Sequence, residues 1–283
     1  MSGDFVALLG TKGGPAIRPG SSMPTSHLLS LAGTRVVVDC GLGVTRGLCD
    51  QGMQLKDLRH VLITHLHSDH YLELGPLLHT AWTAGLAHPV SVWGPEGLGD
   101  YWRHFRAALA FDIAIRQEDE GRPPLADLVR IEVLPEGPLA VGGLTVRSLP
   151  TVHPPVPCLA YRLEGGGKAV VFGADTAPMP GMADFARGAD LLIHEAMLEA
   201  ALPALVARVG NGDGRLMHHL RRAHTPAHEA ARIAAAAGVG ALALGHLIPA
   251  DDPDWTAADW QAAVAPHWAG PLHLGRDGLR IAL

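Results

Sequence analysis

Short apolar runs bounded by turn residues recur along the whole chain. Runs of about four to eight residues, rich in β-branched and aromatic side chains, are typical of strands. In the first half they predict strands at Phe5–Leu9, Ser26–Leu31, Arg35–Asp39, Leu58–Thr64 and Val90–Trp93. In the second half they predict strands at Val129–Leu134, Pro138–Val141, Leu144–Leu149, Cys158–Glu164, Ala169–Gly173, Asp190–His194, Ala241–Leu244, His273–Leu274 and Leu279–Ala282.

Apolar positions at helical spacing lie between these groups of strands. They predict helices over Tyr71–Gly85, Gly97–Leu109, Thr225–Ala237 and Trp255–His267. The charged segment Asp112–Pro124 ends in proline, and we expect it to form a surface loop.

The order of these elements indicates the fold class. Strands outnumber helices, and hairpin-length turns such as Gly33-Thr34 join several of them. We therefore expect an α/β (α+β) protein with two sheets packed face to face and helices outside, a four-layer αββα sandwich forming one domain over residues 1–283. A doubly wound Rossmann sheet fits less well, because the first βα turn lacks G-x-G-x-x-G.

Composition narrows the choice of function. The chain has 283 residues, 22 Lys and Arg against 28 Asp and Glu, and 17 His. The net charge of −6 is the opposite of the basic footprint of a dedicated nucleic-acid binder. No signal peptide and no apolar stretch of about 20 residues is visible, so we expect a soluble cytoplasmic protein without a membrane partner.

The cysteines give no sign of a metal finger or a redox pair. Cys40, Cys49 and Cys158 contain no C-x-x-C spacing, and three is an odd number for a disulfide framework. We expect buried thiols, with Cys158 close enough in sequence to His153 to border a pocket.

A histidine cluster follows the apolar strand Leu58–Thr64. It reads Thr64-His65-Leu66-His67-Ser68-Asp69-His70. Alternation in an extended segment sends His65 and His67 to the same side, and a following turn directs Asp69 and His70 back toward it. Imidazole and carboxylate ligands together suit divalent cations, with Zn²⁺ expected first and Mn²⁺ or Fe²⁺ compatible.

Three further candidate ligands end predicted strands downstream. They are His153 after Leu149–Val152, Asp175 after Val170–Ala174, and His246 after Ala243–Gly245. Each has an ordinary structural interpretation when taken alone, but the three together with the histidine cluster point to one metal site at one edge of a sheet scaffold.

This set of motifs resembles the metallo-β-lactamase superfamily over nearly the whole chain. The resemblance implies the αββα fold of that superfamily and a binuclear site in which a bridging hydroxide cleaves an ester. One metal would take His65, His67 and His153, the other Asp69, His70 and His246, and Asp175 would bridge them. Asp69 would also orient the hydroxide or accept its proton.

A second pair of motifs resembles the ribonuclease Z branch. These are His194-Glu195-Ala196 at the end of a strand and His224-Thr225-Pro226 before a helix. The resemblance implies that His224 faces the substrate phosphate and donates a proton to the leaving group, while Glu195 orients it. Thr225 and Pro226 are also a good N-cap and first residue for the helix.

Three other histidines lie near these motifs in the sequence. We expect His194 to pack behind the site. For His218 and His219, the pocket mouth and the open surface are equally compatible with the sequence.

One departure from ribonuclease Z affects the choice of substrate. That enzyme carries a long basic arm for transfer RNA between the third and fourth ligand motifs, whereas only residues 154–174 lie there in this chain. Additional chain is instead found at Phe111–Glu136 and Met197–Arg222, which we expect to form pocket walls. Aromatic candidates for the walls, which would otherwise be core residues, are Trp82, Trp102, Phe111 and Trp255.

We therefore predict a metal-dependent hydrolase of a small ester and expect that ester to be a phosphodiester. The alternative is a carboxylic ester, lactone or sulfate ester on the same site. A tRNA 3′-processing endonuclease, a di-iron redox protein and a non-catalytic binding module fit less well. The expected partner is a small-molecule ester rather than nucleic acid, and the resemblance suggests a homodimer.

Overall fold

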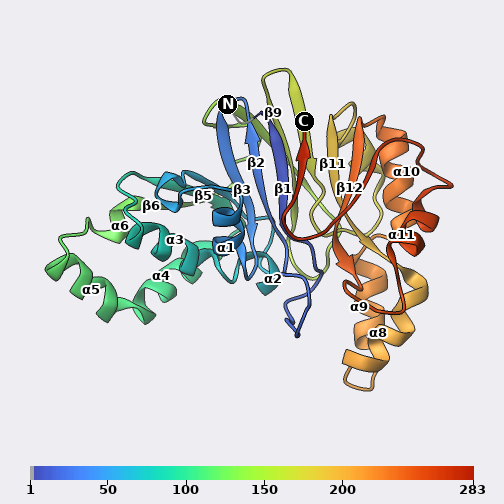
Figure 1. The fold of residues 1–283 in the computed structure, drawn as a ribbon, viewed down its shortest axis with the longest axis horizontal. Coiled ribbons are helices and arrows are strands. Elements are labelled where there is room, and N and C mark those ends of the chain that lie inside the picture. The colour runs from blue at the N-terminus through green and yellow to red at the C-terminus, as the bar shows by residue number, and fades with distance from the viewer. Residues whose placement is uncertain (1–2) are drawn as a thin grey trace.

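The computed structural model describes residues 3–283 and consists of two mixed sheets with helices outside them (Figure 1). The first sheet has seven strands, which are in spatial order β14 (Leu279–Ala282), β1 (Phe5–Gly10), β2 (Ser26–Leu31), β3 (Thr34–Cys40), β4 (His60–Leu62), β5 (Val90–Gly94) and β6 (Val129–Val133). Strands β14 to β3 are antiparallel, and β3 to β6 are parallel.

The second sheet repeats this plan. Its seven strands are in spatial order β13 (Leu272–Leu274), β12 (Ala241–Ile248), β11 (Leu191–Met197), β10 (Lys168–Phe172), β9 (Leu159–Gly165), β8 (Leu144–Pro150) and β7 (Leu139–Val141). Strands β10 to β13 are parallel, and β7 to β10 are antiparallel. The carboxyl ends of the parallel strands of both sheets meet at one edge of the sandwich, and this edge carries the site described below.

Strand β1 shows why the sandwich has four layers. Alternate side chains of a strand face opposite sides of its sheet. Val6 and Leu8 pack between the two sheets, whereas Ala7 and Leu9 pack under the helices of the first sheet. Because both faces are covered, the whole strand is buried and apolar. The predicted αββα sandwich is confirmed, and the Rossmann alternative is wrong.

Helices cover the outer face of each sheet. Over the first sheet lie α1 (Val44–Asp50), the short α2 (Ser68–Tyr71), α3 (Leu74–Thr83), α4 (Leu98–Ala108) and α6 (Leu125–Leu128), with the 3-10 turn η1 (Leu55–Asp57). Over the second lie α7 (Pro180–Phe185), α10 (Ala227–Ala237) and α11 (Ala257–Val264). Between β11 and α10 the chain forms the turn η2 (Glu199–Ala201) and a pair of helices, α8 (Leu202–Val209) and α9 (Arg215–Ala223), which we call the α8–α9 hairpin.

The expectation of a surface loop at Asp112–Pro124 is wrong. Helix α5 covers Ala110–Asp119 and projects from the body of the molecule with α4 (Figure 1). The charges that suggested a loop form helical pairs instead, because Arg116 contacts both Asp112 and Glu120 at i,i+4 spacing. Within residues 3–283, no helix has both the length and the apolar character needed to cross a membrane.

Candidate metal centre

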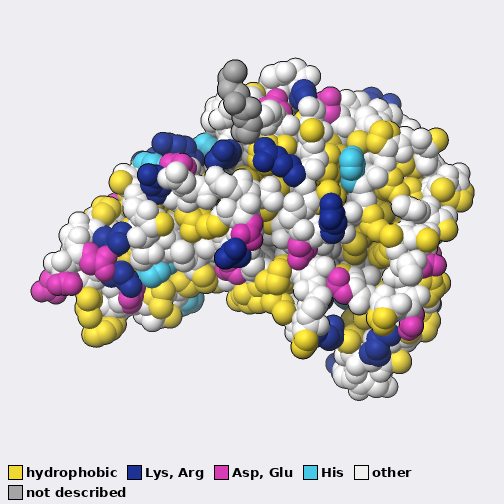
Figure 2. All heavy atoms as spheres, in the orientation of Figure 1, with side chains coloured by type: hydrophobic (Ala, Val, Ile, Leu, Met, Phe, Trp, Pro, Cys, Tyr) yellow, Lys and Arg dark blue, Asp and Glu magenta, His cyan; other side chains and the backbone are white. Residues whose placement is uncertain are grey.

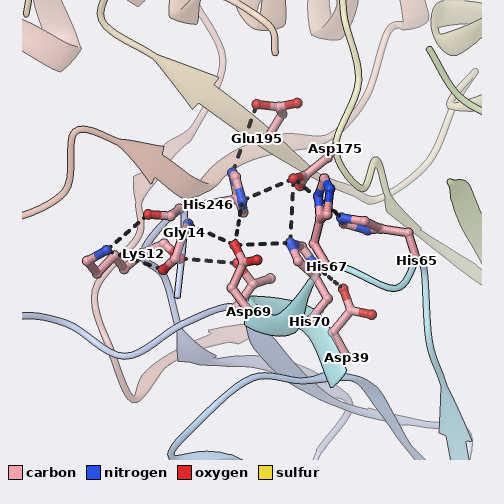
Figure 3. A network of polar contacts seen from close by, with 12 residues as sticks. Lys12, Gly14, Asp39, His65, His67, Asp69, His70, Asp175, Glu195 and His246 are labelled. Atoms are coloured by element: carbon pink, nitrogen blue, oxygen red, sulfur yellow. Dashed lines mark hydrogen bonds and ion pairs between the residues drawn. The ribbon is translucent and has the colours of Figure 1, made fainter. Parts of the chain in front are cut away.

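The predicted ligands come together at the shared edge of the two sheets (Figure 3). From the first sheet, His65 and His67 lie in the loop after β4, and Asp69 and His70 lie in α2. From the second sheet, His153 follows β8, Asp175 follows β10, and His246 lies within β12. Segments far apart in sequence therefore supply one cluster of nitrogen and oxygen donors.

His65, His67 and His153 form the first group of donors. His67 Nδ1 lies 3.1 Å from His65 Nε2 and 3.0 Å from His153 Nε2. His153 donates its Nδ1 proton to the carbonyl oxygen of Ala223 at 3.0 Å, which leaves a lone pair on Nε2. Ligand nitrogens of a tetrahedral zinc site, with Zn–N of about 2.0–2.1 Å, are separated by about 3.3 Å. The observed spacing fits that geometry.

Asp69, His70 and His246 form the second group. His246 Nε2 lies 3.4 Å from Asp69 Oδ2, and His70 Nε2 lies 3.7 Å from the same oxygen. The donor atoms of all three residues lie within 4.8 Å of one another, and all three side chains are buried. The composition of two imidazoles and one carboxylate suits a divalent cation.

Asp175 connects the two groups. Its Oδ2 atom lies 3.8 Å from both His65 Nε2 and His153 Nε2, 3.5 Å from His70 Nε2 and 3.1 Å from His246 Nε2. Among the residues that the structure describes, Asp175 Oδ1 and His70 Nε2 are buried atoms without a hydrogen-bond partner. Buried polar atoms are normally satisfied, so unpaired nitrogen and oxygen atoms within one cluster of possible metal ligands fit bound cations. The site suits divalent metal ions, and Asp175 stands where a shared ligand is expected.

The electrostatics of His70 also favour positive charge at this point. Its Nδ1 lies 2.7 Å from Asp39 Oδ2. Burial lowers the pKa of His70, but Asp175, Asp39 and Asp69 outweigh burial and raise it well above the usual value. Three carboxylates around one buried imidazole require compensating positive charge, which a proton or a cation supplies.

Asp39 is a residue that the sequence reasoning missed. It is the residue before the last in strand β3, is 2% exposed and has a φ of 62°. Its carboxylate accepts hydrogen bonds from the backbone N–H and the hydroxyl of Thr64, at 2.8 and 2.9 Å, while also holding His70. A carboxylate that orients a ligand histidine is a recurrent feature of metal sites. The available signal was one acidic residue at the end of the apolar run Val36–Val38.

A strand irregularity positions His246. In the pairing of β11 with β12, Glu195 faces Gly245 and Ala196 faces Leu247, so His246 is an extra residue without a partner. Its φ of 43° lies in the left-handed region, which costs energy for a residue with a side chain. Bulges redirect side chains next to active sites. This bulge directs the imidazole toward Asp69 and Asp175.

Glu195 and His224 form a buried pair beside the second group. Glu195 Oε2 lies 2.9 Å from His224 Nδ1, and the backbone N–H of Thr176 donates to Glu195 Oε1 at 2.5 Å. Burial lowers the pKa of His224, but the charge of Glu195 outweighs it and raises the pKa to about 9. The His224 ring stacks on that of His246 with a centroid separation of 5.4 Å. The structure therefore brings together the two residues predicted to act on the leaving-group side.

The capping role predicted for Thr225 is wrong. Helix α10 begins at Ala227, its N-cap is Pro226, and no side chain caps it. Thr225 instead donates its hydroxyl proton to the carbonyl oxygen of Thr176 at 2.5 Å. This bond ties the segment that carries His224 to the segment that carries Asp175. His194 is fully buried behind the site, with Nδ1 2.8 Å from the carbonyl oxygen of Glu195.

A cavity of about 400 Å³ lies over the metal centre. Its floor includes His67, Asp69, Asp175, His224 and His246. Its walls come from the loop of residues 11–25, which we call the N-terminal loop, and from the α8–α9 hairpin. The expected wall at Met197–Arg222 is therefore present.

Several other expectations about the walls are corrected or resolved. No residue of Phe111–Glu136 lines the cavity, because that segment forms most of α5, all of α6 and the edge strand β6 of the first sheet. The four aromatic candidates are also absent from the lining. His219 lines the cavity, whereas His218 is exposed. Cys158 borders the site, with Sγ 3.5 Å from His65 Nδ1.

The sequence reasoning also missed the N-terminal loop. The backbone N–H of Gly14 donates to Asp69 Oδ2 at 2.8 Å (Figure 3). A Cβ atom at Gly13 would lie 2.7 Å from Ile248 Cγ1 and 3.0 Å from His246 Cε1, so the close approach requires glycine. Lys12 and Arg18 of this loop line the cavity. No periodicity marks these residues, and only the glycine pair hints at a close contact.

Comparison with known proteins agrees with this geometry. Residues 34–247 match the family described as the Beta-lactamase superfamily domain. Proteins named Ribonuclease Z from Mycobacterium bovis and Mycolicibacterium paratuberculosis are 31% and 34% identical to this chain, over 98% of this chain and 97% of their own length.

Solved structures show the same fold. The metallo-beta-lactamase fold protein YhfI from Bacillus subtilis superposes with a TM-score of 0.73 at 23% identity, covering 99% of this chain and 100% of its own. The short form of human tRNase Z superposes with a TM-score of 0.66 at 19% identity, covering 98% of each chain. The chain therefore belongs to the beta-lactamase superfamily, as a metal-dependent hydrolase of its ribonuclease Z-like branch.

Proposed function

We propose that this protein hydrolyses a phosphodiester bond of a small molecule at a binuclear metal centre. One observation carries the proposal: Asp175 and His224, whose imidazole is held by Glu195, both line the same cavity of about 400 Å³. A cavity of that size matches a small-molecule site. Relatives named Ribonuclease Z, which are 31–34% identical, add support for phosphodiester chemistry.

In this proposal the two groups of ligands each hold one cation. His65, His67 and His153 would hold the first and Asp69, His70 and His246 the second, while Asp175 lies close to donor atoms of both groups. When bound, the two cations supply an activated water as nucleophile and neutralise charge that develops on the ester oxygens. Zinc is the metal we propose, because histidine and carboxylate ligands at this spacing suit it, and Mn²⁺ or Fe²⁺ fits the same donors.

The protein's own groups move the protons. Asp69 Oδ2 accepts a hydrogen bond from the backbone N–H of Gly14, so Asp69 lies between the N-terminal loop and His246. This position lets it orient the attacking water and accept its proton. Glu195 holds His224 through Nδ1, so Nε2 is the atom left to donate a proton to the leaving oxygen.

A second candidate function is maturation of transfer RNA at its 3′ end. The proteins named Ribonuclease Z are covered to 97% of their length, so the absence of a long arm does not separate this chain from them. Against this candidate, basic side chains on the face shown in Figure 2 are interspersed with acidic ones rather than forming one continuous surface. Phosphate-rich partners need many Lys and Arg contacts.

A panel of substrates distinguishes these candidates. Purified protein is supplied with Zn²⁺, Mn²⁺ or Fe²⁺ and given bis(p-nitrophenyl) phosphate, p-nitrophenyl acetate, p-nitrophenyl sulfate and a precursor tRNA with a 3′ trailer. We expect metal-dependent hydrolysis of the phosphodiester that disappears in Asp175→Ala. Faster turnover of the acetate or the sulfate contradicts the proposal. Trailer removal at a kcat/KM far above that of the small diester replaces it with the second candidate.

A further inference from the structure

The cavity over the metal centre has two chemically different walls. The N-terminal loop contributes the cations Lys12 and Arg18. The α8–α9 hairpin and the end of β12 contribute apolar side chains, which we call the apolar wall: Leu205, Val209, Leu216, Leu220 and Ile248. What the two walls imply about the substrate rests on the proposed function and makes the expected class of phosphodiester more specific.

Lys12 is a buried cation without an anionic partner. Its side chain is part of the cavity lining, and the residue is 7% exposed. The ammonium group donates to the carbonyl oxygens of Gly13 and Gly14 at 3.1 and 3.2 Å, which leaves one of its three donors unused. Among residues 3–283, no carboxylate forms a direct ion pair with it, although the charges of Asp69 and Asp251 act to raise its pKa. A buried charge normally has a counter-ion, so this wall is suited to an anionic ligand.

Arg18 extends the same positive wall toward solvent. It is exposed, lines the cavity and forms no ion pair within the described part of the chain. Burial, and after it the charge of Arg18, lowers the pKa of Lys12 despite the opposing charges of Asp69 and Asp251. An anion bound near both cations reduces the repulsion between them. A phosphodiester carries one negative charge at neutral pH and fits between them and the metal centre.

The apolar wall results from helical spacing. Leu205 and Val209 are four residues apart on α8, and Leu216 and Leu220 are four residues apart on α9, so each helix presents one stripe. The stripes meet Met197 and Ile248 in a small cluster separate from the main cores. Val209 is still 42% exposed at the mouth.

We propose that the natural substrate is an amphiphilic phosphodiester, whose anionic phosphate lies against Lys12 and Arg18 and whose alkyl or aryl ester group lies on the apolar wall. Water adds its oxygen to phosphorus, the phosphorus–oxygen bond to the leaving alcohol breaks, and a proton passes to that leaving oxygen. The products are a phosphomonoester and an alcohol, and no oxidant or reductant is consumed.

The test is a series of p-nitrophenyl alkyl phosphates with methyl, butyl, hexyl and octyl groups, assayed with the metal-loaded protein. A fully buried methylene is worth about fourfold in binding, and on a half-open wall about twofold. We expect kcat/KM to rise about tenfold or more from methyl to hexyl. A flat or falling profile with measurable methyl hydrolysis overturns this inference but leaves phosphodiesterase activity intact. No hydrolysis of any member contradicts the proposed function itself.

Matched variants separate specific contacts from general damage. Val209→Asn introduces a polar group at an exposed wall position and is expected to lower the hexyl-to-methyl ratio of kcat/KM about fivefold. Ile115→Asn alters a similarly exposed apolar residue of α5, outside the cavity, and is expected to keep the wild-type ratio. An unchanged ratio in Val209→Asn, or an equal fall in both variants, overturns the role of the apolar wall.

The positive wall has its own readout. Arg18→Gln is expected to raise KM about fivefold for every chain length, and Arg18→Lys to restore most of it, with a weaker dependence on salt in the glutamine variant. An effect of Arg18→Gln that is confined to long chains, or no effect on KM, overturns the assignment of the phosphate to this wall.

Discussion

The metal centre and the walls of the cavity are built in different ways. The ligands are buried except His67, which is half-buried, and they lie near the carboxyl ends of strands from both sheets or in the short helix α2. A further carboxylate, Asp39, contacts the ligand His70. The walls are a loop and a helical hairpin, partly exposed and packed in a small cluster of their own. Changes at the centre should therefore abolish chemistry, whereas changes in the walls should alter preference. The predictions below test that division.

The largest effect is expected at the ligands. Asp69→Ala removes a carboxylate that faces His70, His246 and the cavity. We expect kcat for bis(p-nitrophenyl) phosphate to fall by about a thousandfold or more, because both metal binding and proton transfer are affected. Asp184→Ala, at an exposed aspartate of α7, is the matched control and should keep wild-type activity. Retention of a tenth of the activity in Asp69→Ala would remove this residue from the mechanism.

The next effect is expected at the proton donor. His224→Ala should lower kcat by about 100- to 1,000-fold, the range typical of a lost general acid, while the metal content stays at the wild-type value. The loss should be larger for diesters that release an alkyl alcohol than for those that release p-nitrophenol, which needs less help from an acid. An equal loss for both kinds of leaving group would contradict proton donation by His224.

A smaller effect, on metal affinity, is expected at Asp39, which contacts a metal ligand and is not itself one of the ligands. Asp39→Asn keeps the shape of the side chain but removes the charge that holds His70. Such outer residues typically contribute about 10- to 100-fold to metal affinity. Competition with a chelator measures this loss, and Asp184→Asn is the control. If affinity is unchanged, the contact of Asp39 with His70 serves only the fold.

The smallest effect is expected on the stability of the protein, from a substitution in the apolar wall. Val209→Ala removes two methyl groups from a residue that is 42% exposed. The free energy of unfolding in urea should change by less than about 0.5 kcal/mol, as for most surface substitutions. A loss above about 2 kcal/mol would show that the hairpin is part of the structural core, and the division between centre and walls would fail.

The sequence predicted the centre better than the walls, for a physical reason. Ligands such as His65, His153 and Asp175 follow strands whose apolar runs are visible, and strand ends gather at one edge of a sandwich. Asp39 and the bulge at His246 depend on pairing between distant strands, which a single sequence does not display. The stripe on α8 was visible at four-residue spacing, but two short helices within Met197–Arg222 gave too little periodicity to be recognised.

The surface helix α5 shows the same limit of sequence-based prediction in a segment that was predicted wrongly. Its charged residues looked like a loop, yet Asp112, Arg116 and Glu120 form a ladder of helical ion pairs. Charge alone does not distinguish a loop from an exposed helix, because spacing decides whether the charges pair.

Metal stoichiometry tests the central claim most directly. Elemental analysis of the purified protein after exposure to zinc should give two zinc ions per chain, and Asp175→Ala should lose both, because its Oδ2 atom lies close to donors of both groups. His218→Ala, at an exposed histidine outside the cavity, should keep two. One ion per wild-type chain, or two ions retained by Asp175→Ala, would contradict a binuclear centre organised around Asp175.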